Sequence, residues 1–410
     1  MNVLVVNAGS SSLKYQLFNT STDEVLAKGL CDRIGIDGSK IEHKNITKGT
    51  KTVKETPMSD HSVAMQLVVD MLTDAEVGSI KSMDEIEAVG HRVVHGGSYF
   101  SKSILLTDDV LAKLELCRDF APLHTPAAIT GIKACLAVMA SKPQVLVFDT
   151  AFHQTMAPEA YMYALPYEYY EKYGIRRYGF HGSSHRYVSA EMAKLLNKPL
   201  EETKIVTCHI GNGSSISAVK GGKVVDTSMG FTPLAGVEMG TRCGDIDPAI
   251  VTFIMEKENL SAAEINAVMN KKSGFLGVTE FSSDSRDIEN TLIDGESNPH
   301  YERCKLANDI LVYQIKKYIG AYAAAMNGLD AVVFTAGIGE NNGTFRNEIC
   351  ADMEYLGIEI DTELNKKIRG SAGITKVSKD SSKVAVYMIP TNEELVIARD
   401  TEELAKTVLK

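Results

Sequence analysis

The sequence lacks any C-x-x-C pair, although its 410 residues include seven cysteines. Scattered single cysteines argue against a zinc site and a disulfide framework, and they fit a reducing compartment. An excess of positive charge is also missing, because the formal net charge is -10. That balance argues against a general binder of nucleic acids or of anionic membranes. If this protein handles anions, it must use locally placed cations, backbone N–H groups or a metal ion.

Long apolar runs are absent as well. The longest uncharged stretch, near 318–329, is too short to cross a bilayer, and the amino terminus has neither a basic region nor a cleavage site. Hydrophobic residues make up 44% and charged residues 23%, which is typical of a globular enzyme. We therefore expect a soluble protein of the cytoplasm, with enough residues for two domains.

Short runs rich in Val and Ile alternate with longer helical patterns, which indicates an α/β architecture. Eight runs are predicted to be strands, and helical periodicity is clearest in five segments. The predicted strands are 3–6, 13–18, 89–94, 144–148, 204–209, 215–219, 331–335 and 384–389. The predicted helices are 61–73, 107–119, 126–140, 187–197 and 303–326.

A low-complexity linker between the halves is missing too, so a domain boundary must be a tight hinge. Residues 3–18 and 205–219 share one pattern, which is a strand, a turn of small residues and a second strand. This repeat suggests a duplicated fold. We predict an amino-terminal domain over 1–150, rejoined by 395–410, and a carboxy-terminal domain over 151–394.

Three turns of small residues are candidates for holding phosphate. In 7–14 the small side chains free backbone N–H groups, and Lys14 follows; the P-loop pattern G-x-x-x-x-G-K-[ST] is absent. In 209–215 two glycines spaced by one residue permit close backbone approach. The third turn, 336–341, directly follows a predicted buried strand, where α/β folds place nucleotides. Any one of them alone is better explained as a plain turn, but three together favour a nucleotide.

Residues 5–14, Val-Val-Asn-Ala-Gly-Ser-Ser-Ser-Leu-Lys, resemble the amino-terminal signature of the acetate kinase family, and residues 205–222 resemble its second signature. Five further motifs follow in the family's order. They are His91–Gly97, Phe148–His153, Tyr178–Gly182, Gly240–Asp245 and Pro390–Leu395. The resemblance covers essentially the whole chain. It implies the α/β fold shared by sugar kinases, actin and heat-shock ATPases, with two duplicated ribonuclease H-like domains and a nucleotide cleft between them.

The resemblance implies a Mg²⁺-dependent, reversible transfer of the γ-phosphoryl group of ATP to acetate, giving acetyl phosphate and ADP. Acetate is already ionised at neutral pH, so no general base is needed to create the nucleophile. The obstacle is repulsion between that anion and the triphosphate. Catalysis by direct in-line transfer should therefore rest on positioning and charge neutralisation.

Four residues of the matched motifs are expected to be catalytic. Arg92 holds the substrate carboxylate and Arg242 spans the substrate and the transferred group, because guanidinium forks fix such oxygens at two points. His181 donates to the transferring phosphoryl oxygens. Asp149, at the end of a predicted strand, orients Arg92 and the water shell of the metal and is not an obligatory base.

By resemblance, Glu393 and Asn7 bind Mg²⁺, with Mn²⁺ as an alternative. A carboxylate favoured at a helix start is a second, compatible interpretation of Glu393. Contacts to ATP or ADP are expected from the three turns and from 284–286. These residues are Ser10, Ser12, Lys14, His209, Ile210, Gly211, Asn212, Gly213, Asp284, Ser285, Arg286, Gly337, Ile338, Gly339, Glu340 and Asn341. Ser285 stands where family members often carry a larger apolar residue, so a looser hold on the nucleoside is expected.

The acyl pocket of the family maps to a small apolar set beside Arg92. The set is Val94, Leu123, Phe180 and Pro233. Each added methylene is worth only about 1–3 kcal/mol of discrimination, so propionate is expected to be a poorer but real substrate. A propionate or butyrate kinase remains an alternative. An actin-like nucleotide switch is another, although a hydrolytic switch needs no carboxylate clamp such as Arg92 with Arg242.

By resemblance the protein is expected to be a homodimer whose substrates are acetate and ATP, without nucleic-acid or membrane partners. His181 and His185 lie four residues apart, as in a helical metal pair. Gly182, Ser183 and Ser184 between them are poor helix formers, and Ser184 is predicted to cap the helix that follows. A structural metal there is therefore not favoured.

Overall fold

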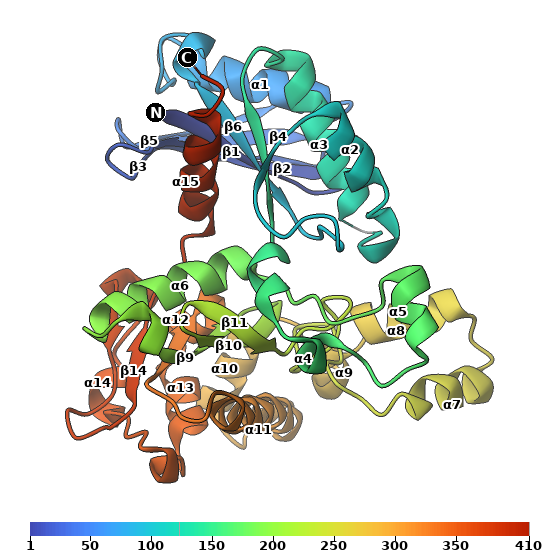
Figure 1. The fold of residues 1–410 in the computed structure, drawn as a ribbon, viewed down its shortest axis with the longest axis vertical. Helices are drawn as coiled ribbons and strands as arrows, with labels where there is room; N and C mark the ends of the chain where they lie inside the picture. The colour runs from blue at the N-terminus through green and yellow to red at the C-terminus, as the bar shows by residue number, and fades with distance from the viewer. Residues whose placement is uncertain (123, 410) are drawn as a thin grey trace. The chain divides into compact units, whose positions relative to one another are not determined.

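The computed structural model describes residues 1–122 and 124–409 (Figure 1). The chain forms two compact units: unit 1 is Met1–Phe152 with Asn392–Lys410, and unit 2 is His153–Thr391. Each unit contains one sheet with helices packed on it, so the α/β class expected from the sequence is confirmed. Among the described residues, no helix is long and apolar enough to cross a membrane.

Unit 1 is built on an eight-stranded sheet in the order β5-β4-β3-β2-β1-β6-β8-β7. Its strands are β1 (Asn2–Ala8), β2 (Ser12–Asn19), β3 (Glu24–Asp32), β4 (Lys40–Asn45), β5 (Thr50–Glu55), β6 (Ala88–Val93), β7 (Ile104–Leu105) and β8 (Gln144–Phe148). Strands β1 to β5 form an antiparallel meander, whereas β6 and β8 run parallel to β1. The central runs are almost wholly apolar because both faces of β1 and β8 are covered.

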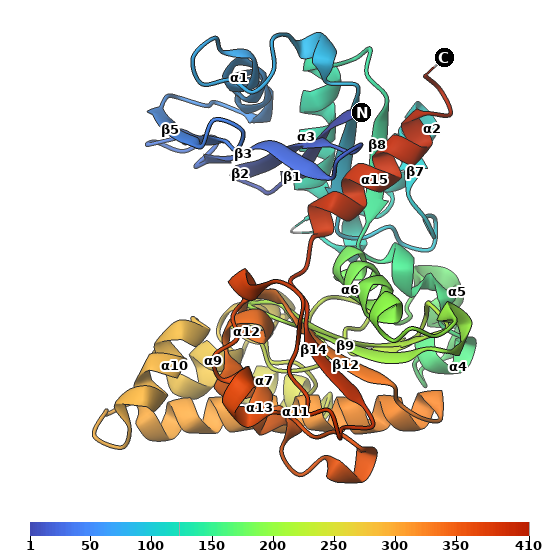
Figure 2. The ribbon, with the colours of Figure 1, turned by 90° about the vertical axis from the view of Figure 1, so that its left-hand side faces the viewer.

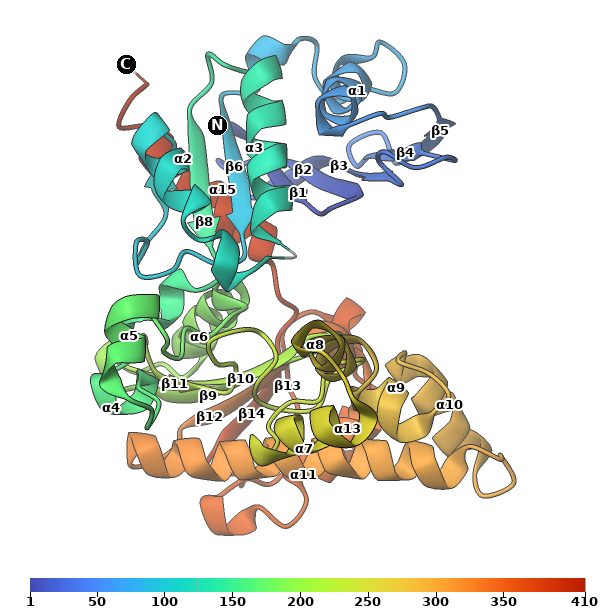
Figure 3. The same cartoon turned by 90° about the vertical axis from the view of Figure 1, so that its right-hand side faces the viewer.

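Helices cover both faces of this central part. They are α1 (His61–Thr73), α2 (Asp108–Glu115), α3 (Thr125–Val138) and α15 (Glu393–Ala405). Helix α1 lies over one face of the sheet (Figure 3). The core that contains its buried residues also includes Leu4 and Val6 of β1. On the other face α15 packs against β1, β6 and β8 (Figure 2). A Cβ on Gly90 would lie 2.3 Å from Oγ1 of Thr401, so the glycine permits this close approach.

Unit 2 is built on a six-stranded sheet in the order β11-β10-β9-β12-β14-β13. Its strands are β9 (Lys204–Ile210), β10 (Ser214–Lys220), β11 (Lys223–Thr227), β12 (Ala331–Thr335), β13 (Thr375–Lys376) and β14 (Ala385–Met388). Strands β9, β10 and β11 are antiparallel, whereas β12 and β14 run parallel to β9.

The helices of unit 2 are α4 (Pro158–Tyr161), α5 (Tyr167–Tyr173), α6 (Gly182–Leu195), α7 (Ala249–Glu258), α8 (Ala262–Lys271), α9 (Gly274–Thr279), α10 (Ser285–Asp294), α11 (Tyr301–Met326), α12 (Ala336–Asn341), α13 (Gly343–Cys350) and α14 (Thr362–Asn365). Leu311, Ile315 and Ile319 of α11 pack into the larger core. On the other face α6 contributes Val188 and Met192 to a smaller cluster.

The two sheets have the same topology at their centres. In both, three antiparallel strands are followed by two strands parallel to the first, so β1, β2, β3, β6 and β8 correspond to β9, β10, β11, β12 and β14. The duplicated fold suggested by the repeat of 3–18 in 205–219 is thereby confirmed. A helix that follows the last parallel strand of each sheet packs on the other unit's sheet. Helix α6 comes after β8 of unit 1 in the chain but packs on β9 and β12 of unit 2. Helix α15 comes after β14 of unit 2 but packs on β1, β6 and β8 of unit 1.

Candidate active site

The residues predicted to form the site fall in both units, and each group is described within its own unit. Unit 1 holds Asn7, Ser10, Ser12, Lys14, Arg92, Val94, Asp149 and Glu393. Unit 2 holds Phe180, His181, Pro233, Arg242 and the nucleotide residues of 209–213, 284–286 and 337–341. Leu123 lies outside the described residues.

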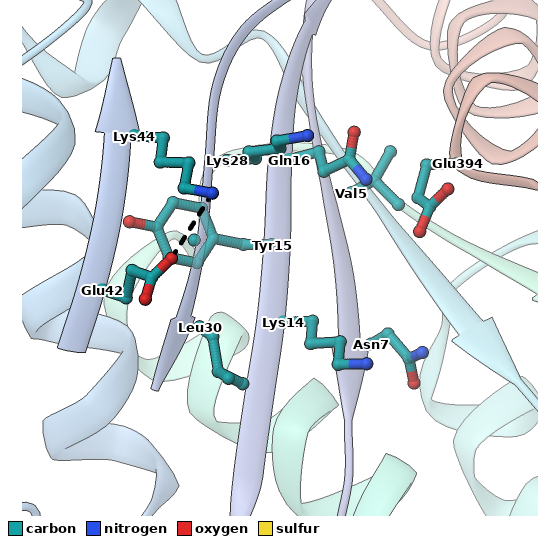
Figure 4. Close-up of a pocket in the computed structure, with 11 residues that line it drawn as sticks. Val5, Asn7, Lys14, Tyr15, Gln16, Lys28, Leu30, Glu42, Lys44 and Glu394 are labelled. Carbon is teal, nitrogen blue, oxygen red and sulfur yellow. Dashed lines mark ion pairs between the residues drawn. The ribbon is translucent and has the colours of Figure 1, made fainter. Parts of the chain in front are cut away.

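The first small-residue turn joins β1 to β2. Gly9 N donates to the Ser12 carbonyl over 2.8 Å, which closes the turn. Asn7 and Lys14 pair directly across the two strands, so both side chains emerge on one face of the sheet. Together with Glu394 they line a hollow of about 210 Å³, which Figure 4 shows in close-up. The two strands and α15 thus place an amide, an ammonium group and a carboxylate around one hollow.

Arg92 and Asp149 form a bidentate pair at the ends of β6 and β8. Arg92 Nε donates to Oδ1 of Asp149 over 3.1 Å, and Nη2 donates to Oδ2 over 2.7 Å. Asp149 is 2% exposed, whereas the Arg92 side chain is 23% exposed. Asp149, followed by Glu393 and Glu394, raises the pKa of Arg92 against the effect of burial. The carboxylate therefore fixes a guanidinium that still reaches solvent.

Glu393 is the first residue of α15, behind the N-cap Asn392. Its Oε1 is buried without a hydrogen-bond partner among the described residues. Burial, with help from Asp149 and Glu394, raises the pKa of Glu393 to about 7, although Arg92 opposes the shift. A buried, unsatisfied carboxylate oxygen is a suitable ligand for a hard cation, so Glu393 fits the Mg²⁺ site expected here. However, the described residues contain no cluster of three His, Cys, Asp or Glu side chains that could hold a metal ion.

The second small-residue turn joins β9 to β10 and lies beside two catalytic candidates. A Cβ on Gly213 would lie 2.7 Å from Nη2 of Arg242 and 3.4 Å from Nε2 of His181. Only a residue without a side chain leaves this space to the guanidinium. The turn therefore brings Arg242 and His181 to one point.

Arg242 is held from behind by a main-chain oxygen, because its Nη1 donates to the Pro233 carbonyl over 2.6 Å. Burial lowers its pKa. Phe180, which is 1% exposed, directly precedes His181. Two of the apolar residues expected to line the acyl pocket are thus linked to the catalytic candidates, one by a hydrogen bond and one through the chain.

His181 caps α6 in a left-handed conformation, with φ 57° and ψ 30°. The helix begins at Gly182, so the prediction that Ser184 caps a later helix is wrong. Ser184 lies inside the first turn, and its hydroxyl bonds Nδ1 of His209 at 2.8 Å and Oγ1 of Thr391 at 2.8 Å. The rings of His181 and His209 stack with their centroids 4.1 Å apart.

The third predicted turn is helical, since Ala336–Asn341 forms α12. Oε1 of Glu340 accepts from the backbone N of Ala336 over 2.8 Å and from that of Thr391 over 3.1 Å, which satisfies amides at the ends of β12 and β14. A Cβ on Gly211 would lie 3.7 Å from the backbone N of Gly337. The second turn and α12 are therefore neighbours.

The segment 284–286 begins helix α10. Asp284 caps it by accepting from the backbone N of Arg286, and the Arg286 side chain folds back onto the same carboxylate with Nη2–Oδ2 at 2.6 Å. A Cβ on Gly240 would lie 3.0 Å from the Ser283 carbonyl and 3.7 Å from that of Asn212. Thus the beginning of α10 and the 211–213 turn meet at Gly240.

The residues that carry the hydroxyl groups behind His181 were not among the site residues expected from the sequence. Ser215 bonds Nδ1 of His181, and Thr391 reaches His209 through Ser184. The signal was present in β10, a buried strand that contains serines at 214, 215 and 217. Buried polar residues on alternate positions of a strand share one face and require partners there.

Known proteins resemble this chain over its full length. Residues 2–399 match the Acetokinase family. An acetate kinase of Halothermothrix orenii is 55% identical over 99% of this chain and 100% of its own length. The crystal structure of Porphyromonas gingivalis acetate kinase has a TM-score of 0.93 at 49% identity, covering 98% of this chain and 99% of that one. A propionate kinase from Francisella tularensis has a TM-score of 0.89 at 41% identity, with the same coverage. The chain belongs to the acetokinase family.

Proposed function

We propose that this protein is an acetate kinase, which transfers the γ-phosphoryl group of ATP reversibly to acetate and forms acetyl phosphate and ADP. The observation that carries the proposal is the convergence of Arg242 Nη2 and His181 Nε2 beside Gly213, next to the turn expected to hold phosphate. A cation and a hydrogen-bond donor at one point suit the charge that develops on a transferring phosphoryl group.

The residues act by position and charge. Asp149 holds the Nε/Nη2 side of the Arg92 guanidinium with two hydrogen bonds, and Arg92 binds the acetate carboxylate through the N–H groups at its Nη1/Nη2 end. Arg242 neutralises charge on the acceptor and the transferred group. His181 donates a hydrogen bond to the phosphoryl oxygens. Because acetate is already the nucleophile, no proton needs to be removed from it, and Asp149 remains an orienting group.

Glu393 and Asn7 are the residues that would hold Mg²⁺, which when bound supplies positive charge against the triphosphate. The unsatisfied Oε1 of Glu393 supports this assignment. Mn²⁺ has similar ligand preferences and is expected to substitute. A cytoplasmic location, expected from the cysteine pattern, stays a prediction.

Nucleotide binding is assigned to the converging segments of unit 2 and to the β1–β2 turn of unit 1. The contacts at Gly211 and Gly240 support it, because they bring 209–213 beside α12 and the start of α10. Ser285 offers little surface to a base, and Arg286 is occupied by Asp284. We therefore expect moderate rather than strict preference for ATP over other nucleoside triphosphates.

Propionate is the second substrate to consider, because the propionate kinase of Francisella tularensis is 41% identical to this chain. Val94, Phe180 and Pro233 are all medium-sized or large and leave acetate as the favoured acid. Discrimination by one methylene is worth about 1–3 kcal/mol, so propionate should react more slowly but measurably.

A homodimer is part of the proposal, and helix α7 supports it. This helix is rich in Ile, Val and Phe yet buries none of its residues, and Phe253 is 60% exposed. Exposed apolar surface of this kind marks interaction sites. Light scattering should give twice the chain mass, and Phe253→Glu should shift it toward the monomer; a monomer in the unaltered protein would refute this part.

The test of the activity is a hydroxylamine trap for acyl phosphate, with Mg-ATP and acetate, propionate or butyrate. Acetyl hydroxamate should form fastest with acetate and be lost in Arg242→Ala. Arg303→Ala, an exposed arginine paired with Glu280, is the matched control and should keep full activity. Product mainly from a longer acid would change the substrate. ATP hydrolysis without any hydroxamate would favour the nucleotide switch instead.

A further inference from the structure

Helices usually pack on sheets through apolar side chains, but the interface between α6 and the sheet of unit 2 contains a row of polar residues, called the polar seam below. Thr207, His185, Ser215 and Ser217 are all fully buried there. Polar groups buried between a helix and a sheet cost about 1–3 kcal/mol each when they lack a partner. Each of these four has at least one hydrogen-bond partner, so the seam is a satisfied network and not a packing defect.

The network leads from the sheet to His181. Thr207 Oγ1 lies 2.7 Å from Nδ1 of His185, whose Nε2 lies 2.7 Å from Oγ of Ser215. The same Ser215 hydroxyl lies 2.9 Å from Nδ1 of His181. Because Ser215 has only one proton, it can donate to one of the two imidazoles and must accept from the other.

The distances favour one direction for this chain of bonds. Thr207 is a buried hydroxyl with two acceptors within its reach, Nδ1 of His185 at 2.7 Å and the Ser217 carbonyl at 3.4 Å, which is longer than an ordinary O–H···O bond. The proton of Thr207 is therefore better satisfied by the imidazole. His185 is neutral, because burial followed by His153 and His209 lowers its pKa well below the ordinary value. A neutral ring that accepts at Nδ1 donates from Nε2, so Ser215 accepts there and donates to His181 Nδ1.

We propose that Thr207, His185 and Ser215 form a hydrogen-bond relay that holds His181 as the neutral tautomer with its proton on Nε2. In this tautomer the Nε2–H is the donor on the side of Gly213 and Arg242. The opposite tautomer would direct a lone pair there, which repels phosphoryl oxygens. The proposal rests on the role given to His181 above, and it makes Ser215 and His185 positioning residues.

The positive charge of Arg242 explains why a neutral hydrogen-bond donor is favoured at His181. An imidazolium would also donate from Nε2, but it would place a second positive charge beside the guanidinium, which is buried and has only the Pro233 carbonyl as a described hydrogen-bond partner. Neighbouring like charges disfavour the protonated ring. The relay therefore supplies a hydrogen-bond donor at this point without adding a charge.

The experiment uses the full-length protein labelled with ¹⁵N-histidine, and His181→Asn identifies the signals of His181. Two-bond ¹⁵N–¹H spectra should show Nε2 protonated and Nδ1 unprotonated. Ser215→Ala should move the His181 signals toward the other tautomer and lower kcat about tenfold, the equivalent of one hydrogen bond. KM for acetate and for Mg-ATP should not change, because the donor acts in the transition state. Ser215→Thr, which keeps the hydroxyl, should restore both readouts.

Ser217→Ala is the matched control, because Ser217 lies two residues along the same buried strand face and bonds His153 instead of His181. It should leave the His181 signals and kcat unchanged. His185→Gln is a second route if Ser215→Ala does not fold, and it should also shift the His181 tautomer.

The relay would be overturned if Nδ1 of His181 were protonated in the unaltered protein. It would also be overturned if the His181 signals stayed the same in both Ser215→Ala and His185→Gln. Absence of acyl phosphate formation would instead overturn the proposed function, while the spectra would still decide the tautomer.

Discussion

Asp149 in unit 1 and Glu238 in unit 2 are equally buried, each 2% exposed, but their surroundings differ. Asp149 is held by both ends of the Arg92 fork, whereas neither oxygen of Glu238 has a hydrogen-bond partner among the described residues. Burial raises the pKa of Glu238 to about 8. The same depth thus holds an ion pair in one unit and a protonated acid in the other.

The difference extends to the residues assigned to catalysis. Unit 1 presents the ammonium group of Lys14, the Arg92–Asp149 ion pair and the buried carboxyl group of Glu393. Unit 2 presents Arg242 with a carbonyl behind it and neutral imidazoles linked by hydroxyls. Although the two sheets share one topology, unit 1 is suited to binding ions. Unit 2 is suited to donating hydrogen bonds to the charge that develops on the transferring phosphoryl group. The following changes test that contrast.

Breaking the ion pair of unit 1 should have the largest effect. We expect Arg92→Ala to lower kcat/KM about 10²–10³-fold, the range for loss of one preorganised charged donor. Asp149→Asn keeps one hydrogen bond and should cost less. The double variant should be no worse than Arg92→Ala alone, because Asp149 acts through Arg92. Steady-state kinetics on acetate checks this; additive losses would mean that Asp149 has an independent role.

Removing the unpaired carboxylate of unit 1 should weaken Mg²⁺ binding more than it weakens acetate binding. We expect Glu393→Gln to raise the Mg²⁺ concentration needed for half-maximal rate about 10–100-fold, while KM for acetate stays nearly constant. Glu394→Gln is a neighbouring control with a smaller expected effect. Magnesium titrations of both variants decide the point, and equal responses would argue against Glu393 as the ligand.

The two small-residue turns can be compared by the same substitution. A Cβ at position 213 would lie 2.7 Å from Arg242 Nη2, and one at position 9 would lie 2.8 Å from Ser12 Oγ. Gly213→Ala should displace the guanidinium and lower kcat about tenfold, the loss of about one hydrogen bond. Gly9→Ala should mainly raise KM for Mg-ATP. Thermal unfolding should change little in either variant, and a large drop in Tm would show that the turns are structural.

The protonated acid of unit 2 should make stability depend on pH. Between the ordinary value of 4.5 and about 8, native Glu238 keeps a proton that the unfolded chain has released. The native state then binds more protons, so this residue's contribution to stability falls as pH rises through that window. Glu238→Gln should be more stable than the parent above pH 8, with the difference fading below pH 4.5. Urea midpoints across pH test this, and a constant difference would contradict the shift.

The central strands could be predicted because their signal is local. Val3 to Val6 and Val332 to Phe334 are apolar runs bounded by small residues, and both are buried strands. Strand β5 was missed, because it is a polar strand at the sheet edge that buries none of its residues. Its neighbour β4 was missed as well, because its sequence is mostly polar. Hydrophobic pattern cannot identify a strand that is held mainly by main-chain pairing to its neighbour.

Residues and motifs were enough to propose a candidate site, which stays a prediction, but its geometry could not be foreseen. Nothing in the neighbouring sequence shows that His181 adopts a left-handed conformation. Because His181 is the N-cap, α6 already begins at Gly182, and Ser184 lies inside its first turn. Two glycines in 336–341 suggested an open turn, yet the segment is helical and Glu340 bonds the amides of Ala336 and Thr391. These outcomes depend on partners distant in the sequence, which a single chain read alone does not reveal.

The crossing of α15 into unit 1 has a consequence for synthesis on the ribosome. Unit 2 is continuous over 153–391, but the face of β1, β6 and β8 that α15 covers stays bare until the last residues emerge. Domains usually fold in the order in which they are made. Here the first-made sheet is completed only when α15 has been made, so a chain that stopped near Thr391 would keep this apolar face exposed and would be prone to aggregate.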